Sequence, residues 1–178
     1  MLHHIQLTFR EKLALRSATK YIVLHHTEVK GRHNVREIHH WHLNRETNGK
    51  KWAGIAYHYY IDKDGEIFVG RPRDTIGAHT RGYNSYSVGV CFEGNFNVEK
   101  MSEKQLESSV MLISVLSLGY YNAAIRGHRN FNANNTCPGL NFPMKELLQR
   151  IQIQKKRFIR LYGDPQTVDY SFLLNSLD

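Results

Sequence analysis

Three side chains that can bind a transition metal stand where predicted strands run out into loops. His25 follows the apolar run 21–24, His128 follows the short run 124–127, and Cys137 lies nine positions further on in an Asn-rich loop. Two imidazoles and one thiolate suit Zn²⁺, and catalytic zinc keeps three protein ligands and a fourth position for water. The spacing is too long for a zinc-finger knuckle but suits two ligands bridged by a loop. Any one of these histidines alone is more often a surface or core residue than a ligand.

The order of apolar runs and breaks favours an α/β fold, with a central mixed β-sheet flanked by α-helices and the zinc site at one rim of the sheet. Asn34 and Ser102 are typical helix N-caps, and Asp64-Gly65 predicts a hairpin turn. The patterns predict strands at 21–24, 57–61, 66–69, 87–92 and 124–127, and helices at 35–46, 103–118 and 143–153. Because strand ends can meet at one rim of such a sheet, we expect the three metal-binding side chains to converge there.

The composition is that of one globular domain. The chain has 178 residues, of which 41% are hydrophobic and 22% charged, and these fractions exclude long disordered segments. No stretch approaches the roughly 18 apolar residues of a membrane span, and residues 1–16 lack the apolar core of a secretory signal. Two cysteines cannot form a disulfide framework. Nothing in the sequence sets an oligomeric state.

The formal net charge of +8 suits a polyanionic partner such as nucleic acid, an anionic membrane or a cell wall, although it also serves solubility. The one dense basic run lies near the C-terminus and comprises Arg150, Lys155, Lys156, Arg157 and Arg160. On a helix such a face is usually solvated surface. No nucleic-acid recognition motif accompanies the charge, so we expect no nucleic-acid partner.

Eleven histidines are the least usual feature of the composition. Histidine is a common metal ligand and titrates near neutral pH, so the clustering points to metal or acid–base chemistry. His39, His40 and His42 fall in the predicted helix 35–46, and we expect them on its surface. A second metal site at His39 and His42 has no further ligand to support it.

Six short motifs follow one another along the chain: Leu24–Thr27, Gly54–Tyr59, Gly77–His79 with Tyr83-Asn84, Ser87–Val90, Gly127–Arg129 and Cys137–Gly139. This series resembles the zinc-dependent N-acetylmuramoyl-L-alanine amidases. More closely, it is similar to the peptidoglycan recognition proteins and the amidase-type lysozymes of bacteriophages. The resemblance covers about residues 20–150, and six ordered motifs over such a span are hard to obtain by chance.

The resemblance implies a zinc cofactor and a role for each matched residue. His25 and His128 correspond to the first two ligands and Cys137 to the third. Zinc would lower the pKa of its bound water towards about 7 and polarise the amide carbonyl. Tyr57 corresponds to the tyrosine that assists catalysis, where a phenol orients the water or donates a hydrogen bond to the oxyanion. The alternative for Tyr57 is a packed aromatic side chain in a Tyr-rich strand.

Two positions depart from the family pattern. A lysine or threonine that helps to hold the oxyanion commonly stands two residues before the third ligand, whereas this chain has Asn135. We expect Asn135 to donate a hydrogen bond there, with Thr136 as the alternative. Cys91 matches an acidic base of a different amidase branch, and here we expect a small buried residue. We expect Glu93 to be a surface or strand-end carboxylate, with a general-base role as the alternative.

The loop after the predicted hairpin lines the substrate groove in the family. The resemblance therefore implies substrate contacts for His79, Arg81 and Asn84, which can offer hydrogen bonds and charge to glycan and to peptide carboxylates. Asn84 could instead cap the loop.

The resemblance covers most of the chain and divides it into an N-terminal lead-in at 1–19, an amidase catalytic domain at 20–153 and a C-terminal extension at 154–178. The extension is short for a wall-binding module and could dock on the domain or mediate self-association. The implied reaction is hydrolysis of the amide between N-acetylmuramic acid and L-alanine of peptidoglycan, by a phage or prophage endolysin or an autolysin. The alternative is a non-catalytic peptidoglycan-binding module of the same fold. We expect the protein to stay in the cytoplasm until its release to the wall, or to be secreted as part of a longer chain.

Overall fold

A six-stranded mixed sheet forms the centre of the computed structural model, which describes residues 1–177. Its strand order is β1-β6-β5-β7-β2-β8; β5 and β6 pair antiparallel, and all other neighbours pair parallel. The strands are β1 (Leu2–His4), β2 (Tyr21–His26), β5 (Tyr59–Ile61), β6 (Ile67–Val69), β7 (Ser87–Phe92) and β8 (Ala124–Gly127). The predicted α/β class with a central mixed sheet is confirmed.

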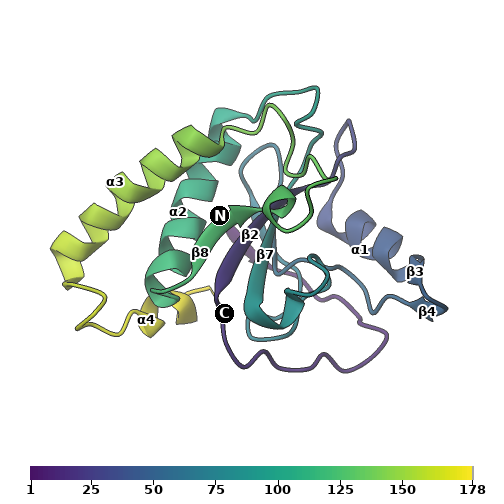
Figure 1. Ribbon diagram of the computed structural model, residues 1–178, viewed down its shortest axis with the longest axis horizontal. Coiled ribbons are helices and arrows are strands. Elements are labelled where there is room, and N and C mark those ends of the chain that lie inside the picture. The colour runs from purple at the N-terminus through teal and green to yellow at the C-terminus, as the bar shows by residue number, and fades with distance from the viewer. Residues whose placement is uncertain (178) are drawn as a thin grey trace.

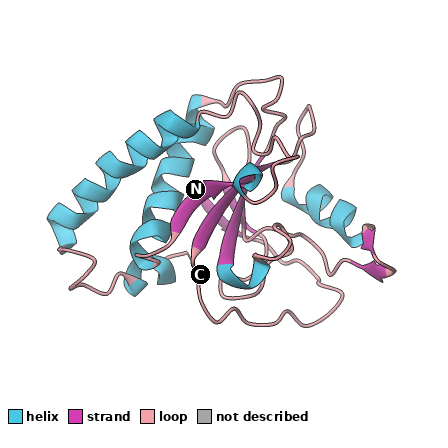
Figure 2. Ribbon diagram, in the orientation of Figure 1, coloured by secondary structure: helices cyan, strands magenta, loops and turns pink. Residues whose placement is uncertain are grey.

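Helices cover both faces of this sheet (Figures 1 and 2). Helices α2 and α3 lie on one side, and α1 lies on the other beside the small β3–β4 hairpin. The elements are α1 (Val35–Leu43), β3 (Glu46–Thr47), β4 (Lys50–Lys51), the 3-10 turns η1 (Asn84–Tyr86) and η2 (His128–Asn130), α2 (Glu103–Gly119), α3 (Met144–Tyr162) and α4 (Ser171–Asn175). No helix within residues 1–177 has the length and hydrophobicity of a membrane span.

Side-chain alternation along β7 builds two cores. Val90 and Phe92 belong to the larger core beneath α2 and α3, whereas Cys91 packs on the other face with Val35 and Ile38 of α1. Such two-sided burial is expected for central parallel strands. The register places His25 of β2 directly beside Cys91, so both lie on the α1 side of the sheet.

Helix α1 begins as predicted but ends earlier. Asn34 accepts hydrogen bonds from the backbone of the first turn, and Glu37 closes a capping box. The helix stops at Leu43 rather than at residue 46, because the chain turns there into the β3–β4 hairpin. Of the three histidines predicted on its surface, His40 is exposed. The prediction is wrong for His39 and His42, which are buried.

Two of these histidines are buried because their rings hold the segment that leads to Tyr57. His39 Nδ1 accepts a hydrogen bond from the Ile55 backbone, and His42 Nδ1 accepts one from Ala56. His39 also donates from Nε2 to the Thr8 carbonyl. Helix α1 is thus hydrogen-bonded both to the N-terminal lead-in and to the segment that precedes Tyr57.

Both chain ends pack on the domain. The lead-in 1–19 contributes β1, which pairs with β6 at the edge of the sheet. Helix α3 extends to Tyr162 rather than to residue 153, so the predicted boundary at 153/154 falls inside it. The rest of the extension folds back as α4, whose Leu174 packs against Gly119 of α2. This packing is one of the two alternatives that the sequence left open for the extension, the other being self-association.

Two buried histidines outside the site are held uncharged. His58 accepts a hydrogen bond from the Gly89 backbone and donates one to the Thr75 carbonyl. Burial lowers its pKa to about 3, with a further contribution from nearby Arg16. Burial likewise lowers the pKa of His42 to about 4, with Arg45 adding to the effect.

We expect the free energy of unfolding to fall as the pH is lowered from about 6.5 towards about 4. In this window the unfolded chain protonates His42 and His58 near their ordinary pKa of 6.5, while the folded chain keeps both neutral. Protons therefore favour the unfolded chain, by up to about 1.4 kcal/mol per pH unit for each group. Urea unfolding between about pH 7 and about pH 4 measures the slope.

The comparison of His42→Gln with His40→Gln isolates the contribution of one imidazole. His42→Gln should flatten the slope, whereas His40→Gln, which removes an exposed histidine of the same helix, should keep it. Equal slopes for His42→Gln and the wild type would contradict the assignment.

Candidate metal centre

The three predicted ligands converge at one rim of the sheet. Their ligand atoms all lie within 4.8 Å of one another, and the Cys137 Sγ lies 3.7 Å from the His25 Nδ1. The geometry follows from pairing: β2 and β8 run parallel and side by side, so His25 and His128 emerge from neighbouring strand ends. The following loop then returns Cys137 to the same point. The convergence predicted from the sequence is confirmed.

The protonation states of this cluster fit a divalent metal. Burial lowers the pKa of His25 well below its ordinary value, with the nearby His128 adding to the shift, and burial also lowers the pKa of His128. Both imidazoles are therefore neutral and keep a lone pair for a metal. Burial raises the pKa of the Cys137 thiol to about 12, so a thiolate here requires a positive charge beside it. Two neutral imidazoles and a thiol that ionises on binding form a donor set that zinc accepts.

His79 orients the first ligand. The His25 Nδ1 faces Cys137, which leaves the Nε2–H to donate to the His79 Nδ1 at 3.0 Å. The His79 Nε2 then carries its proton towards the Ser87 hydroxyl at 3.4 Å, and that hydroxyl donates to the Tyr83 carbonyl. Hydrogen bonds of this kind fix the ring orientation of a metal-binding histidine and raise the basicity of its ligand nitrogen.

Two glycines make the slot in which the His79 ring lies. A Cβ at Gly77 would come within 2.4 Å of the His79 Cδ2, and a Cβ at Gly89 would come within 2.6 Å of the same atom. Gly89 sits in the middle of β7, where a glycine otherwise weakens a strand. The close approach of the imidazole explains why this strand position carries no side chain.

Tyr57 lies beside the candidate ligands, just before β5 rather than within it. Its ring centroid is 5.2 Å from that of His25, and its hydroxyl contacts the Cys91 thiol. Burial, followed by the neighbouring Cys91 and Cys137, raises the Tyr57 pKa well above its ordinary value. The phenol is therefore a hydrogen-bond donor at neutral pH. Cys91 itself is fully buried, as expected.

Asn135, rather than Thr136, faces the metal centre. Its side-chain oxygen accepts a hydrogen bond from the Cys137 backbone at 2.7 Å, and its Nδ2 lies 3.2 Å from the His128 Nδ1. Asn135 thus bridges the second and third ligands and lines the hollow above them, whereas Thr136 is exposed and does not line it. Its role in catalysis stays a prediction.

The three predicted substrate-binding residues do not lie together in the structure. His79 is buried, accepts a hydrogen bond from His25 and contributes to the lining of the hollow. The Asn84 oxygen accepts hydrogen bonds from the His79 and Thr80 backbones, which is the loop-capping alternative. Arg81 is exposed and lies outside the hollow.

Glu93 is buried just after the end of β7, and its carboxylate accepts hydrogen bonds from the His33 and Lys63 backbones. It is therefore the strand-end carboxylate that the sequence predicts.

The hollow has a volume of about 220 Å³, and seven of its lining residues were not predicted as site residues: His26, Thr27, Glu28, Arg45, Trp52, Ala56 and Ala78. Arg45 stacks over the Trp52 ring at 5.4 Å, so the hairpin side of the hollow presents a cation on an aromatic surface. Trp52 and Ala78 also line a neighbouring cavity of about 480 Å³, so the two cavities share part of their walls. Neither residue stood out in the sequence, because Arg45 falls at the end of the predicted helix 35–46 and Trp52 lies seven positions further along the chain.

A mixed α/β sheet with a His-His-Cys cluster at its rim and a protonated tyrosine beside it is the arrangement expected of a metal-dependent hydrolase. A sequence profile described as N-acetylmuramoyl-L-alanine amidase matches residues 15–140, which include all three candidate ligands, Tyr57 and Asn135. The chain belongs to the N-acetylmuramoyl-L-alanine amidase family.

Individual relatives agree with this family. The chain is 32% identical to an endolysin of Klebsiella phage KP32 over 133 residues, which cover 71% of this chain and 84% of the relative. It is 30% identical to peptidoglycan-recognition protein SC2 of Drosophila simulans over 142 residues, or 73% of each chain. Among solved structures, the endolysin amidase LysCS of Clostridium intestinale superposes with a TM-score of 0.78 at 32% identity, covering 85% of this chain and 95% of that one.

We expect Gly89→Ala to weaken zinc binding about 10- to 100-fold, although it touches no ligand. The added methyl group displaces His79 and so frees the His25 ring. Competition with a chromogenic zinc chelator measures the affinity.

Gly119→Ala is the matched control for this substitution. Its methyl group would meet Leu174 at 2.3 Å in the core between α2 and α4, so it should lower stability and leave zinc affinity unchanged. Wild-type zinc affinity in a folded Gly89→Ala protein would disprove the role of the slot.

Proposed function

We propose that this chain hydrolyses the amide bond between N-acetylmuramic acid and the L-alanine of peptidoglycan, with zinc as its metal. The observation that carries the proposal is the convergence of His25, His128 and Cys137 with Tyr57 in one hollow. Membership of the amidase family and the endolysins among the relatives support the same reaction. Retention of both Cys137 and Tyr57 favours hydrolysis over binding alone.

A bound zinc ion supplies Lewis-acid polarisation of the amide carbonyl and a water of lowered pKa. Within the chain, the hydrogen bond from His25 to His79 holds the first ligand in one tautomer. Tyr57, which burial keeps protonated, donates a hydrogen bond to the carbonyl oxygen of the scissile amide as negative charge develops there. The Asn135 amide, next to the third ligand, offers a second donor without a lysine's charge.

The bacterial cell wall is the place of action in this proposal. The relatives named endolysins support a protein that stays in the cytoplasm until it is released to the wall. Secretion as part of a longer chain would bring the same site to the same substrate.

Incubation with purified peptidoglycan tests the reaction directly. We expect newly freed L-alanine amino termini with the zinc-loaded wild type, their loss on chelation, and their return when zinc is restored. Cys137→Ser removes one of three ligands and should lose zinc and activity together. Binding to peptidoglycan without release of termini would disprove hydrolysis and leave the non-catalytic binding module. Full activity of Cys137→Ser would disprove the ligand set.

Replacement of Tyr57 separates its role from that of the metal. We expect Tyr57→Phe to keep zinc affinity and to lower kcat about 10²- to 10³-fold, because one donor to the developing oxyanion is lost. Tyr86→Phe removes the hydroxyl of an exposed tyrosine outside the hollow and should keep full activity. A Tyr57→Phe protein as active as Tyr86→Phe would exclude Tyr57 from the chemistry.

A further inference from the structure

Helix α3 carries most of the net positive charge of the chain. It contains six Lys or Arg residues and one Glu, a net charge of +5 against +8 for the whole chain. Arg150 is neutralised by ion pairs with Glu103 and Glu146. The cations of its second half have no ion-pair partner within residues 1–177, and they are Lys155, Lys156, Arg157 and Arg160.

Exposed apolar side chains share one face of the helix with these cations. At 3.6 residues per turn, the face falls within an arc of about 140°, whose centre lies about 130° around the helix from the buried Leu147 and Ile151. We call it the α3 outer face, and it consists of Ile153, Lys156, Arg157, Arg160 and Leu161.

The apolar members of this face are open to solvent. Ile153 is 56% exposed and Leu161 is 73% exposed. Ile153 and Arg157 also line a groove of about 290 Å³ between α2 and α3, to which α2 contributes Met111 at 47% exposed. Ile153, Leu161 and the neighbouring Met111 thus place exposed apolar surface beside the cations of α3.

The second half of α3 is held firmly although few of its residues reach the main core. Phe158 and Tyr162 form a ring cluster with Tyr170 and Phe172, which the folded-back C-terminal segment supplies. The Tyr170 hydroxyl donates to the Gly163 carbonyl at 2.6 Å, just after the end of the helix. The α3 outer face is therefore a fixed surface of the domain.

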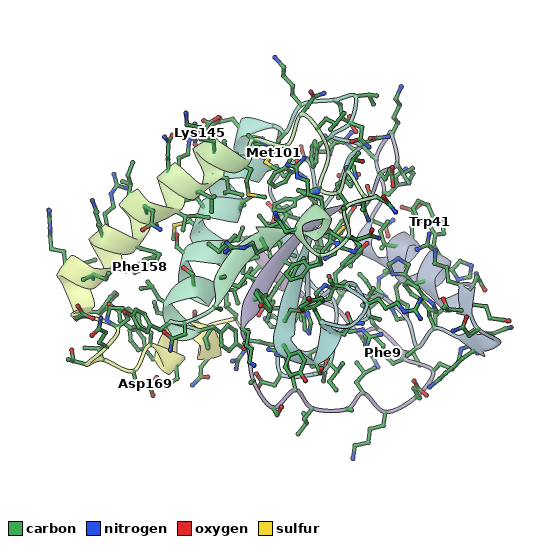
Figure 3. The ribbon with its side chains drawn as sticks, in the orientation of Figure 1. Phe9, Trp41, Met101, Lys145, Phe158 and Asp169 are labelled. Atoms are coloured by element: carbon green, nitrogen blue, oxygen red, sulfur yellow. The ribbon has the colours of Figure 1, made fainter. Side chains whose placement is uncertain are left out.

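This face points away from the metal centre. Helix α3 lies on one side of the sheet, while α1 and the β3–β4 hairpin, which borders the hollow, lie on the other side (Figure 1). Figure 3 shows nitrogen-tipped side chains projecting from the outer edge of α3, with Lys145 labelled among them. A partner bound to the α3 outer face would leave the hollow open.

We propose that the α3 outer face is a docking surface for an acidic phospholipid bilayer. Lys156, Arg157 and Arg160 match the negative headgroups, and Ile153 and Leu161 reach the boundary between headgroups and acyl chains. A soluble polyanion such as a wall phosphate polymer would satisfy the cations but would gain nothing from exposed aliphatic side chains. The bilayer uses both kinds of residue on the face, and this inference does not depend on the hydrolytic activity.

Vesicle co-sedimentation of the full chain tests the docking surface. We expect binding to vesicles of phosphatidylglycerol and phosphatidylcholine that is at least about tenfold tighter than binding to phosphatidylcholine alone, and that weakens with salt. The triple variant Lys156→Gln/Arg157→Gln/Arg160→Gln should bind about 100-fold more weakly, from about fivefold per charge. Absence of wild-type binding to the acidic vesicles would overturn the proposal.

A matched control separates a local face from net charge. Lys30→Gln/Lys100→Gln/Lys104→Gln removes the same charge from exposed lysines outside α3 and should bind within about threefold of the wild type. Equal losses in the two triple variants would overturn the proposal in favour of non-specific attraction.

An apolar double variant separates a bilayer from a soluble polyanion. Ile153→Ser/Leu161→Ser keeps the net charge, so we expect at least about tenfold weaker vesicle binding with unchanged binding to soluble polyphosphate. Vesicle binding that this variant leaves intact would overturn the bilayer in favour of a polyanionic polymer. All variants should release L-alanine termini from purified peptidoglycan like the wild type, so failure of the docking proposal and failure of the proposed hydrolysis are told apart.

Discussion

The hydrogen bond from His25 to His79, inside a slot that only glycines leave open, is the constraint on which the site depends. A histidine at a strand end could otherwise rotate and present either ring nitrogen. The slot requires β7 to pair with β2 in the observed register, which places Gly89 beside Val23 and Cys91 beside His25. The position of β5 follows as well, because His58 hydrogen-bonds to the Gly89 backbone and Tyr57 precedes it. Ligand, positioning residue and tyrosine are thus set by one strand pairing.

Burial gives this geometry its chemical character. The same exclusion of water lowers the pKa of the imidazoles, raises that of the Cys137 thiol and keeps the Tyr57 phenol protonated. In these states the two imidazoles have a free lone pair for a metal, the Cys137 thiol ionises only beside a cation, and the Tyr57 hydroxyl can donate a hydrogen bond. Metal binding to such a cluster adds its free energy to that of folding, because the unfolded chain has no comparable site.

The metal centre and the densest positive charge lie on opposite sides of the molecule. The metal centre, with Arg45 and Trp52 at its border, occupies the rim near α1, while the densest positive charge lies on α3 beyond the opposite face of the sheet. A wall hydrolase with this layout can hold an anionic surface with one side and present its hollow on the other. The C-terminal segment has a structural part in this, since its aromatic rings fix the second half of α3.

The sequence by itself determined the fold class, the capping box at Asn34 and the three candidate ligands, because these rest on local periodicity, on cap chemistry and on motifs a few residues long. Only the tertiary structure decided that His42 is buried, that Asn84 caps a loop, and that His79 hydrogen-bonds to a candidate ligand. Each of these outcomes depends on the hydrogen-bond partner of a polar side chain, and that partner comes from another element or from a loop whose shape local patterns do not define. Hydrophobic periodicity shows which face of an element is buried, but it is silent on polar groups that are buried because they are paired.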